Sequence, residues 1–360
     1  MANLLRRMPV AILCGTLIVA CAAFAQTQTM PPLTPTLSGG PPLVIGHRGA
    51  SGHRPEHTLA SYSLAIDFGV DFIEPDLVST KDGVLVARHE NDISGTTDVA
   101  QKFPGRRTTK TIDGKPIEGY FTEDFTLAEI KTLRAKERLP FRNQGWNGYY
   151  EIPTLQEVIE LAKRRSLETG RVIGIYPETK HPSYFRSIGL ALEPPLLKVL
   201  AEYGYTDASA PVFIQSFEVQ NLKDLSKLTK VHLVQLMEDG KNKPYDFVVA
   251  GDPRSYGDLM TPAGLAAIAA YAAGIGPAKR SIVPQGANRA LLPPTSLVAD
   301  AHKAGLVVHP YTFRDEPEFL APDYGLDPIK EYLQFYRLGV DGLFSDFGDT
   351  AVRARSLMWR

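Results

Sequence analysis

From Leu43 onward, short apolar runs alternate with amphipathic stretches, and this alternation limits the fold more than any other feature. The apolar runs have the length of buried strands, and the stretches between them have helical spacing. The expected strands are 43–46, 71–75, 172–177, 212–217, 232–237, 306–313 and 341–346, with a weaker one at 273–277 or 281–284. The expected helices are 58–68, 154–168, 196–203, 219–228, 261–271, 296–303 and 328–338.

Repeated strand–helix units favour an α/β fold of the TIM (β/α)8 barrel type. An open doubly wound sheet would show the same alternation, but no G-x-G-x-x-G turn follows the first expected strand. The chain has 360 residues, of which 44% are apolar, and this is enough to bury a core of that size. We expect the barrel domain to span residues 43–354.

The run "VLVAR" interrupts the alternation, because it follows the second expected strand after only a few residues. A parallel crossover needs a dozen or more residues, so the two runs must form an extra β-hairpin. A two-residue turn at 81–82 pairs His89 with Glu74, and one at 82–83 pairs it with Asp76. In either register the three side chains share one face of the hairpin.

A second interruption covers residues from about 92 to 150. It contains one helical pattern, at 126–136, and is otherwise rich in Gly, Arg, Thr and aromatic residues. Loops of this length without structure are uncommon in compact domains. We therefore expect a small inserted subdomain, after the second strand, over the mouth of the barrel.

The N-terminus has the pattern of an export signal. Arg6-Arg7 precede an apolar segment that ends in the small-residue pattern Ala23-Phe24-Ala25, which predicts a signal peptide over 1–25 and a periplasmic protein. "IVAC" also resembles a lipoprotein box, which would place a lipid anchor on Cys21; cleavage after Ala25 is favoured. A single spanning helix fits less well, since the apolar part is near the lower length limit and no stop-transfer charges follow. Pro- and Thr-rich residues 26–42 are expected to form a flexible linker.

Overall charge and cysteine content exclude several kinds of function. The 39 basic residues are balanced by 40 acidic ones, which argues against nucleic-acid binding and against a membrane-surface footprint. Both cysteines, Cys14 and Cys21, lie in the N-terminal segment. The folded domain therefore has neither disulfide nor thiol chemistry. The sequence leaves the oligomeric state open.

Polar residues end the expected strands, and the carboxyl ends of barrel strands meet on one face. Glu74, Asp76 and Glu178 would supply three oxygen ligands there, which suits a hard cation. Ca²⁺ ranks first because it tolerates irregular geometry, with Mg²⁺ as the second choice. The alternative is a pair of exposed carboxylates with Lys or Arg partners. Gln215, His309 and Asp346 also lie at strand ends.

His47 and His89 are the candidate acid–base pair, since imidazole changes charge near neutral pH. The alternative, a histidine satisfied within the core, is weakened by the neighbouring carboxylates. Arg48 is a candidate for phosphate recognition, because its planar fork matches phosphate oxygens. Lys180 would add a point charge, although an ion pair with Glu74 or Glu178 explains it nearly as well. We expect His57 to cap or orient, and His53, His181 and His302 to lie on the surface.

Three aromatic residues, Trp146, Phe217 and Phe313, are weaker candidates for shaping a substrate pocket. For most aromatics of the insertion and its surroundings, packing between the insertion and the barrel is the simpler interpretation. A cation site, an arginine and two histidines together indicate phosphate-ester chemistry.

The segments "HRGASGHRPEHT", "DFIEPDLVSTKDG", "VARHE", "YPETK", "QSF", "VVHPYT" and "DGLFSDF" occur in this order between about Leu43 and Val352. Together they resemble the glycerophosphodiester phosphodiesterase family, and most of all its longer, exported branch. The resemblance implies a TIM barrel, a Ca²⁺ or Mg²⁺ site at Glu74, Asp76 and Glu178, and acid–base roles for His47 and His89.

The resemblance also implies hydrolysis of small glycerophosphodiesters, such as glycerophosphocholine or glycerophosphoethanolamine, to sn-glycerol 3-phosphate and an alcohol. In the family the neighbouring glycerol hydroxyl can attack through a cyclic phosphate. Two positions depart from the usual pattern: Glu90 stands where Asp is usual, and Thr179 where an apolar residue is usual.

Two other functions fit part of the pattern. A barrel phosphodiesterase acting on phospholipids or phosphoinositides would favour an exposed apolar rim, whereas the insertion is more typical of a lid over a small polar substrate. A non-catalytic periplasmic binding protein on the same scaffold would be expected to lack a histidine or carboxylate of the site, and all five are present.

Overall fold

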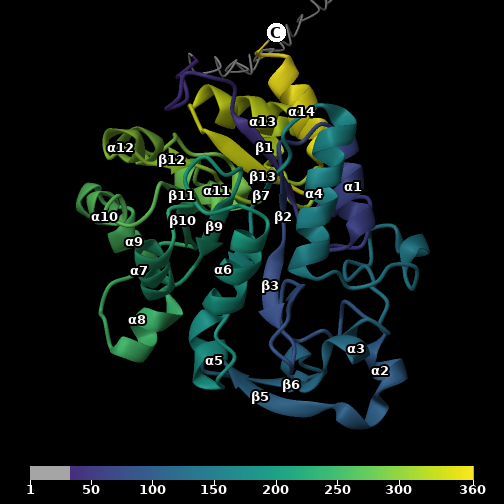
Figure 1. The fold of residues 1–360 in the computed structure, drawn as a ribbon. Helices are drawn as coiled ribbons and strands as arrows, with labels where there is room; N and C mark the ends of the chain where they lie inside the picture. Colours follow the sequence, from purple (N-terminus) through teal and green to yellow (C-terminus); the bar gives the residue numbers. More distant parts are fainter. Residues whose placement is uncertain (1–32, 360) are drawn as a thin grey trace, which may run out of the picture. The chain divides into compact units, whose positions relative to one another are not determined.

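The computed structural model describes residues 33–359, and its central feature is a ring of mostly parallel strands (Figure 1). The expected signal peptide, 1–25, and residues 26–32 lie outside the described residues. The barrel strands are β1 (Leu43–His47), β2 (Phe72–Glu74), β3 (Asp76–Ser79), β7 (Gly174–Ile175), β8 (Glu178–Thr179), β9 (Phe213–Ser216), β10 (His232–Met237), β11 (Gly274–Pro277), β12 (Val307–Val308) and β13 (Gly342–Ser345).

The ring consists of two runs of hydrogen-bonded strands, in the orders β13-β1-β2-β7 and β12-β11-β10-β9-β8-β3-β4, where β4 (Leu85–Ala87) is the second strand of the extra hairpin. The second barrel strand is broken at Pro75, which has no amide hydrogen to donate. Consequently β2 pairs with β1 and β7, whereas β3 pairs with β8. The runs join through a parallel bridge between Ile175 and Val212, and through the Asp341 amide, which donates to the Val308 carbonyl at 2.9 Å. The expected closed barrel is confirmed.

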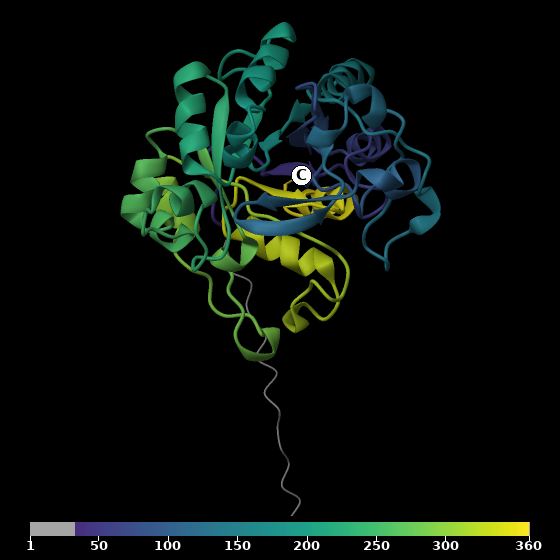
Figure 2. The ribbon, with the colours of Figure 1, turned by 90° about the horizontal axis from the view of Figure 1, so that it is seen from below.

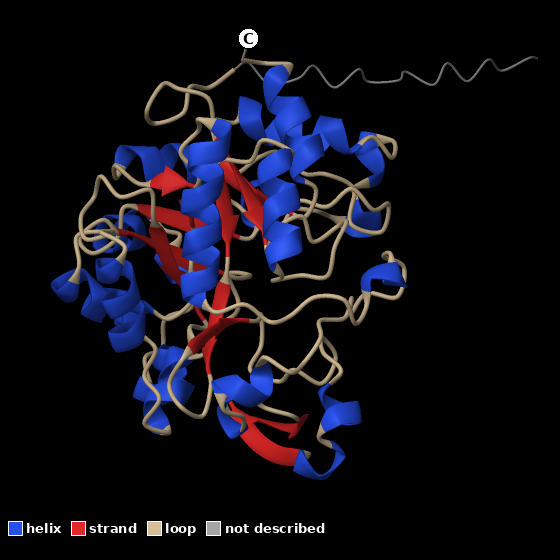
Figure 3. Cartoon of the chain, turned by 45° about the vertical axis from the view of Figure 1, so that its right-hand side comes forward, coloured by secondary structure: helices blue, strands red, loops and turns tan. Residues whose placement is uncertain are grey.

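Helices surround the strands, as Figures 2 and 3 show. They are α1 (Leu59–Asp67), α4 (Leu155–Thr169), α5 (Pro182–Ser187), α6 (Glu193–Glu202), α7 (Val219–Leu228), α8 (Tyr245–Ala250), α9 (Tyr256–Leu259), α10 (Pro262–Ile268), α11 (Lys279–Ile282), α12 (Leu297–Lys303), α13 (Pro328–Arg337) and α14 (Gly348–Ser356), with 3-10 turns η4 (Ala287–Arg289) and η5 (Pro322–Tyr324). The weak strand at 273–277 is β11, and its alternative at 281–284 overlaps α11.

Local sequence explains where the longest helix begins and ends. Thr154 accepts from the Glu157 amide while the Glu157 side chain accepts from the Thr154 amide, so the first turn of α4 is capped in both directions. Gly170, with φ 65°, ends the helix in the left-handed conformation that glycine adopts without penalty. Buried Leu155, Val158 and Ile159 face the barrel.

Aromatic residues fill the interior of the barrel. Tyr176 stacks on Phe213 with ring centroids 5.0 Å apart, and Phe344 meets Tyr176 edge-on at the same distance. His309, which belongs to the expected strand 306–313, lies inside this layer, where its Nδ1 is 2.8 Å from the Tyr176 hydroxyl. The barrel is therefore a packed core, and space for a ligand is left only at the strand ends.

The insertion after β4 (Leu85–Ala87) has more structure than the sequence indicated. It contains α2 (Val99–Lys102), η1 (Pro104–Arg106), β5 (Thr108–Ile112), β6 (Lys115–Gly119), η2 (Thr122–Asp124), α3 (Leu127–Ile130) and η3 (Gln144–Trp146). The helix expected at 126–136 is wrong in length, because the chain leaves α3 and pairs Ala135 with Thr97 in a bridge. The β5–β6 hairpin was not expected, although Asp113-Gly114 at its turn is a hairpin signal.

Residues 33–42, which belong to the expected flexible linker, make backbone contacts with the barrel domain. The Thr34 amide donates to the Arg337 carbonyl at 2.8 Å, and the Leu37 amide donates to Asp341 Oδ1 at 2.6 Å. The composition of this segment does not reveal these contacts, because backbone amides rather than apolar side chains make them. Across residues 33–359, no helix combines the length and the apolar character that a membrane crossing requires.

Candidate active site

A cavity of about 210 Å³ opens where the barrel strands end. Its lining includes seven of the predicted catalytic, metal-binding and substrate-binding residues: His47, Arg48, Glu74, His89, Glu178, Lys180 and Phe217. The other lining residues are Gln215, Leu236, Tyr311, Thr312, Arg314 and Phe344. Barrel geometry thus brings together side chains that are far apart along the chain.

Three carboxylates gather at the base of the cavity. One oxygen from each of Glu74, Asp76 and Glu178 lies within 4.8 Å of the others, and all three residues are buried. The strand break at Pro75 places Glu74 last in β2 and Asp76 first in β3. The register of β3 with β8 then sets Asp76 beside Glu178.

The electrostatics of this cluster fit a cation. Burial raises the pKa of Glu178 to about 8 although Lys180 opposes it, and burial together with Asp76 raises the pKa of Glu74 well above its usual range. Asp76 Oδ1 is buried and has no hydrogen-bond partner. Buried carboxylates that repel one another and leave an oxygen unsatisfied are the environment that a divalent cation would relieve. Their oxygen-only donor set suits a hard cation.

His57 orients Asp76, as expected from its position. Its Nε2 is 2.9 Å from Asp76 Oδ2, and its Nδ1 is 2.7 Å from the Tyr62 hydroxyl. Burial lowers the pKa of His57 to about 4, so the ring is neutral. Neutral His57 can then donate to Asp76 from Nε2 while Nδ1 accepts from Tyr62.

His47 is held by a residue that follows the neighbouring strand β13. Its Nδ1 lies 2.5 Å from Oδ1 of Asp346, which follows β13, and this leaves Nε2 for a ligand. Arg142 and Arg314 bind the other oxygen of Asp346 at 2.6 and 2.9 Å. Burial and the neighbouring Arg48 charge lower the pKa of His47, which favours the neutral, proton-accepting ring.

His89 reaches the cavity by a different route from the one expected. The hairpin pairs Leu77 with Ala87, and the Gly83 amide donates to Thr80 across a three-residue turn. Both expected registers are therefore wrong, because Gly83, with φ 78°, allows one more residue in the turn. His89 lies beyond the ladder and its Nδ1 is 2.9 Å from Glu90 Oε1.

Both cationic candidates line the cavity and both contact carboxylates. Arg48 donates to Glu56 at 2.9 Å, and its backbone amide donates to Glu74 at 2.7 Å. Lys180 Nζ lies 2.8 Å from Glu178 Oε1, which is the ion pair left open by the sequence. Each side chain thus lies between a carboxylate and the cavity.

Two aromatic candidates do not reach the cavity, whereas Phe217 lines it. Phe313 is fully buried and packs edge-on against Phe335 at 4.9 Å, because its side chain points outward from the barrel toward the helices. Trp146 stacks on Tyr150 under the Arg54 guanidinium, which lies 4.0 Å from its ring. The structure therefore places neither ring in the lining of this cavity.

The expectation of surface positions is wrong for two histidines. His181 and His302 each have a side chain that is only 16% exposed and paired with carboxylates. His53 is more accessible and lies 3.3 Å from Asp349. Sequence reasoning also missed Glu56, although its partner Arg48 lies only eight residues earlier. It missed Arg142 because the partners of that side chain, Glu316 and Asp346, lie too far along the chain for a local pattern to reveal them.

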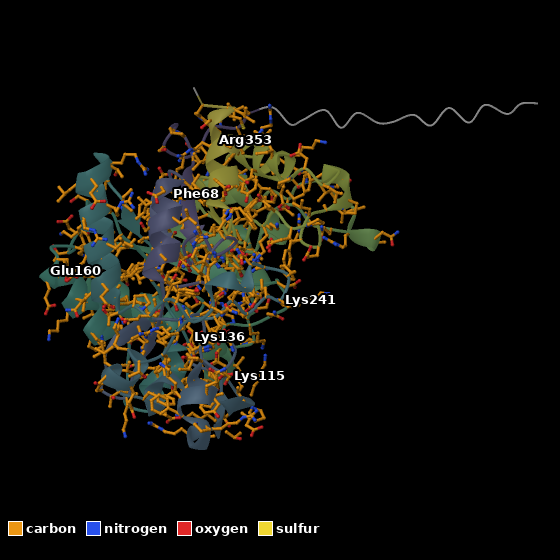
Figure 4. The ribbon with its side chains drawn as sticks, turned by 90° about the vertical axis from the view of Figure 1, so that its right-hand side faces the viewer. Phe68, Lys115, Lys136, Glu160, Lys241 and Arg353 are labelled. Atoms are coloured by element: carbon orange, nitrogen blue, oxygen red, sulfur yellow. The ribbon has the colours of Figure 1, made fainter. Side chains whose placement is uncertain are left out.

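A larger groove of about 740 Å³ adjoins the cavity and shares His89, Glu178, Lys180, Phe217 and Tyr311 with it. One wall comes from the β5–β6 turn of the insertion, with Lys115, and another from a barrel loop, with Lys241. Figure 4 shows both lysines on the same side of the structure. The insertion therefore forms part of the approach to the catalytic cavity.

Comparisons with known proteins agree with this architecture. The chain is 40% identical to the glycerophosphodiester phosphodiesterase GDPD6 of Arabidopsis thaliana over 85% of this chain and 84% of the relative. It is 32% identical to a glycerophosphodiester phosphodiesterase of Haemophilus influenzae over 86% of this chain and 88% of the relative.

Solved structures show the same fold. A phosphodiesterase of Oleispira antarctica, determined in complex with the product sn-glycerol-3-phosphate, matches with a TM-score of 0.59 at 22% identity, covering 89% of this chain and 99% of that one. The model of the glycerophosphoryl diester phosphodiesterase family matches residues 47–350. The chain therefore belongs to this family and is an enzyme that hydrolyses glycerophosphodiesters.

Proposed function

We propose that this chain is an exported phosphodiesterase that cleaves small glycerophosphodiesters to sn-glycerol 3-phosphate and an alcohol, with Ca²⁺ at Glu74, Asp76 and Glu178. The observation that carries the proposal is one cavity lined by two histidines beside three clustered carboxylates. A bound divalent cation would polarise the phosphoryl oxygens and offset their charge. Ca²⁺ is preferred over Mg²⁺ because it tolerates irregular oxygen coordination.

His47 is assigned the role of base in the first step. Asp346 occupies its Nδ1 and would stabilise the imidazolium that forms when Nε2 accepts a proton. The proton comes from the glycerol hydroxyl next to the phosphate, whose oxygen then bonds to phosphorus and forms a cyclic phosphate. The bond between phosphorus and the alcohol oxygen breaks in the same step.

His89 is assigned the role of acid, because it lies where the cavity meets the larger groove. The departing alcohol would leave through this groove and take its proton from His89. Burial and the charges of Arg48 and Lys180 lower the pKa of His89 in the free enzyme. A bound phosphate neutralises those charges and favours the protonated ring.

Water completes the reaction with the two roles exchanged. His89 takes a proton from the attacking water, and His47 returns its proton to the glycerol oxygen as the ring of the cyclic phosphate opens. Arg48 and Lys180 are assigned to the phosphate oxygens, and Phe217 to the wall beside the substrate. Each histidine thus ends the cycle in its starting state.

The decisive experiment is release of glycerol 3-phosphate from glycerophosphocholine by the purified chain, with added Ca²⁺ and with chelator. We expect turnover with Ca²⁺ and its loss with chelator. Absence of turnover in Ca²⁺ would refute the substrate class, and turnover unaffected by chelator would refute the metal dependence.

Export is proposed on the N-terminal residue pattern alone, with Ala25 favoured over Cys21 as the processing position. Mass spectrometry of the protein isolated from periplasmic, membrane and cytoplasmic fractions would give its first residue and its location. A mature chain that begins at Gln26 supports signal-peptidase cleavage, and a lipid-modified Cys21 supports an anchor. A cytoplasmic chain that retains Met1 would contradict both.

A further inference from the structure

A continuous chain of polar contacts runs from His89 into the insertion. His89 Nδ1 is 2.9 Å from Glu90 Oε1, and the other oxygen of Glu90 is 2.7 Å from His181 Nε2. His181 Nδ1 in turn lies 2.6 Å from Oδ2 of Asp113. Each group contacts the next through a separate atom, so all these contacts exist at once.

The chain joins three separate parts of the fold. His89 and Glu90 follow strand β4, and His181 lies between β8 and α5. Asp113 occupies the turn between β5 and β6, and Figure 1 shows this hairpin beside α5. Asp113 and His181 both have left-handed backbones, with φ of 48° and 47°. These conformations aim the two side chains at each other across the gap between insertion and barrel.

His181 must carry both ring protons to donate to two carboxylates. Although burial alone would lower its pKa, hydrogen bonds to Asp113 and Glu90 raise the pKa of His181 to about 9. A charged His181 fixes one oxygen of Glu90, and the second oxygen is then held toward His89. The two carboxylate oxygens of Glu90 thereby bridge the two histidine rings.

We propose that Asp113 and His181 are positioning residues for His89, so that the insertion hairpin sets the orientation of one of the two acid–base groups. This inference rests on the proposed function. Glu90 contacts His89 at Nδ1, so the proton stays on that nitrogen and Nε2 is left for the substrate, just as Asp346 contacts Nδ1 of His47. The insertion therefore completes the acid–base machinery as well as forming a wall of the groove.

The test compares Asp113→Asn with Glu118→Gln. Asn tolerates the left-handed backbone, so the first change removes mainly the charge at the turn. Glu118 lies on the same hairpin, exposed and 3.5 Å from Arg107, so the second change removes a carboxylate outside the chain of contacts. With glycerophosphocholine and saturating Ca²⁺, we expect Asp113→Asn to lower kcat about tenfold with little change in KM. Glu118→Gln should retain wild-type kcat.

A double-mutant cycle separates positioning from general destabilisation. His181→Asn should lower kcat to a similar degree, and the double variant should lose no more than the worse single variant, because both changes break one chain. Thermal midpoints, followed by circular dichroism, should stay close to the wild type. Wild-type kcat in Asp113→Asn, an equal loss in Glu118→Gln, or additive losses in the double variant would overturn the proposal.

Nitrogen-15 spectra of the histidine rings provide a readout independent of turnover. In the wild type we expect His181 to be doubly protonated and His89 to carry its proton on Nδ1. Asp113→Asn should shift both sets of signals, and Glu118→Gln neither. Unchanged His89 signals in Asp113→Asn would overturn the positioning role, whatever the activity of the enzyme. Failure of the wild type to cleave glycerophosphocholine would instead count against the proposed function.

Discussion

The two histidines of the cavity are supported in different ways. His47 ends a barrel strand, has a side chain only 10% exposed, and rests on Asp346 at the end of the neighbouring strand. His89 lies past the end of a hairpin, has a side chain 31% exposed, and rests on Glu90, His181 and the insertion. The orientation of the His47 ring is therefore set by the barrel itself, whereas that of the His89 ring depends on segments added to the barrel.

Removing either ring is expected to have the largest effect. His47→Ala and His89→Ala should each lower kcat/KM for glycerophosphocholine by about a thousandfold, because each deletes a proton carrier. Steady-state kinetics with saturating Ca²⁺ measure this, and His53→Ala serves as control because His53 lies away from the cavity lining. Near-normal activity in either cavity variant would remove that histidine from the mechanism.

The binding of a cation by the three carboxylates should depend on pH. Burial raises the pKa of Glu178 to about 8, so below that pH its carboxyl holds a proton that the cation must displace. Protonation of Glu178 should therefore weaken Ca²⁺ binding by roughly tenfold for each pH unit below about 8. Calorimetric titrations in buffers of different ionisation enthalpy would measure the released proton.

Glu178→Gln is the matched variant for that experiment. It should weaken Ca²⁺ binding by roughly a hundredfold and abolish the pH dependence due to this group. Affinity that does not change with pH in the wild type would contradict the assignment of Glu178 as a ligand that must lose a proton.

Substitution of the supporting carboxylates should separate the two histidines. Asp346→Asn replaces the carboxylate at His47 Nδ1 by a neutral amide, which stabilises the imidazolium less well. We therefore expect kcat to fall by about a hundredfold. Glu90→Gln should cost only about tenfold, since His89 is more accessible to solvent. Equal losses would show that the barrel and the insertion constrain the histidines equally.

The two aromatic residues outside the cavity should have the smallest effect on activity. Phe313→Ala removes a fully buried ring, so the free energy of unfolding should fall by about 4 kcal/mol. Trp146→Ala should cost about 1 kcal/mol through the lost contact with Arg54. Denaturant titrations measure both, and a lower kcat in either folded variant would place that ring in the site after all.

The same contrast separates what the sequence could predict from what it could not. Glu74, Asp76, Glu178 and His47 were predictable, because parallel barrel strands deliver their end residues to one face whatever the intervening chain does. The register that carries His89 was not, because Gly83 lengthens the turn by one residue. Asp113 and Arg142 lie in an insertion without periodicity, and their partners are distant in sequence. The outward direction of the Phe313 side chain was not predictable either, because it depends on where the strand expected at 306–313 ends.

The assignment of His47 as base and His89 as acid is tested most directly by changing the leaving group. Glycerophospho-p-nitrophenol releases an alcohol that departs without needing a proton, unlike choline. On this substrate His89→Ala should recover most of its lost kcat/KM, whereas His47→Ala should remain as impaired as on glycerophosphocholine. Recovery in His47→Ala, or equal impairment of both variants on both substrates, would contradict the account.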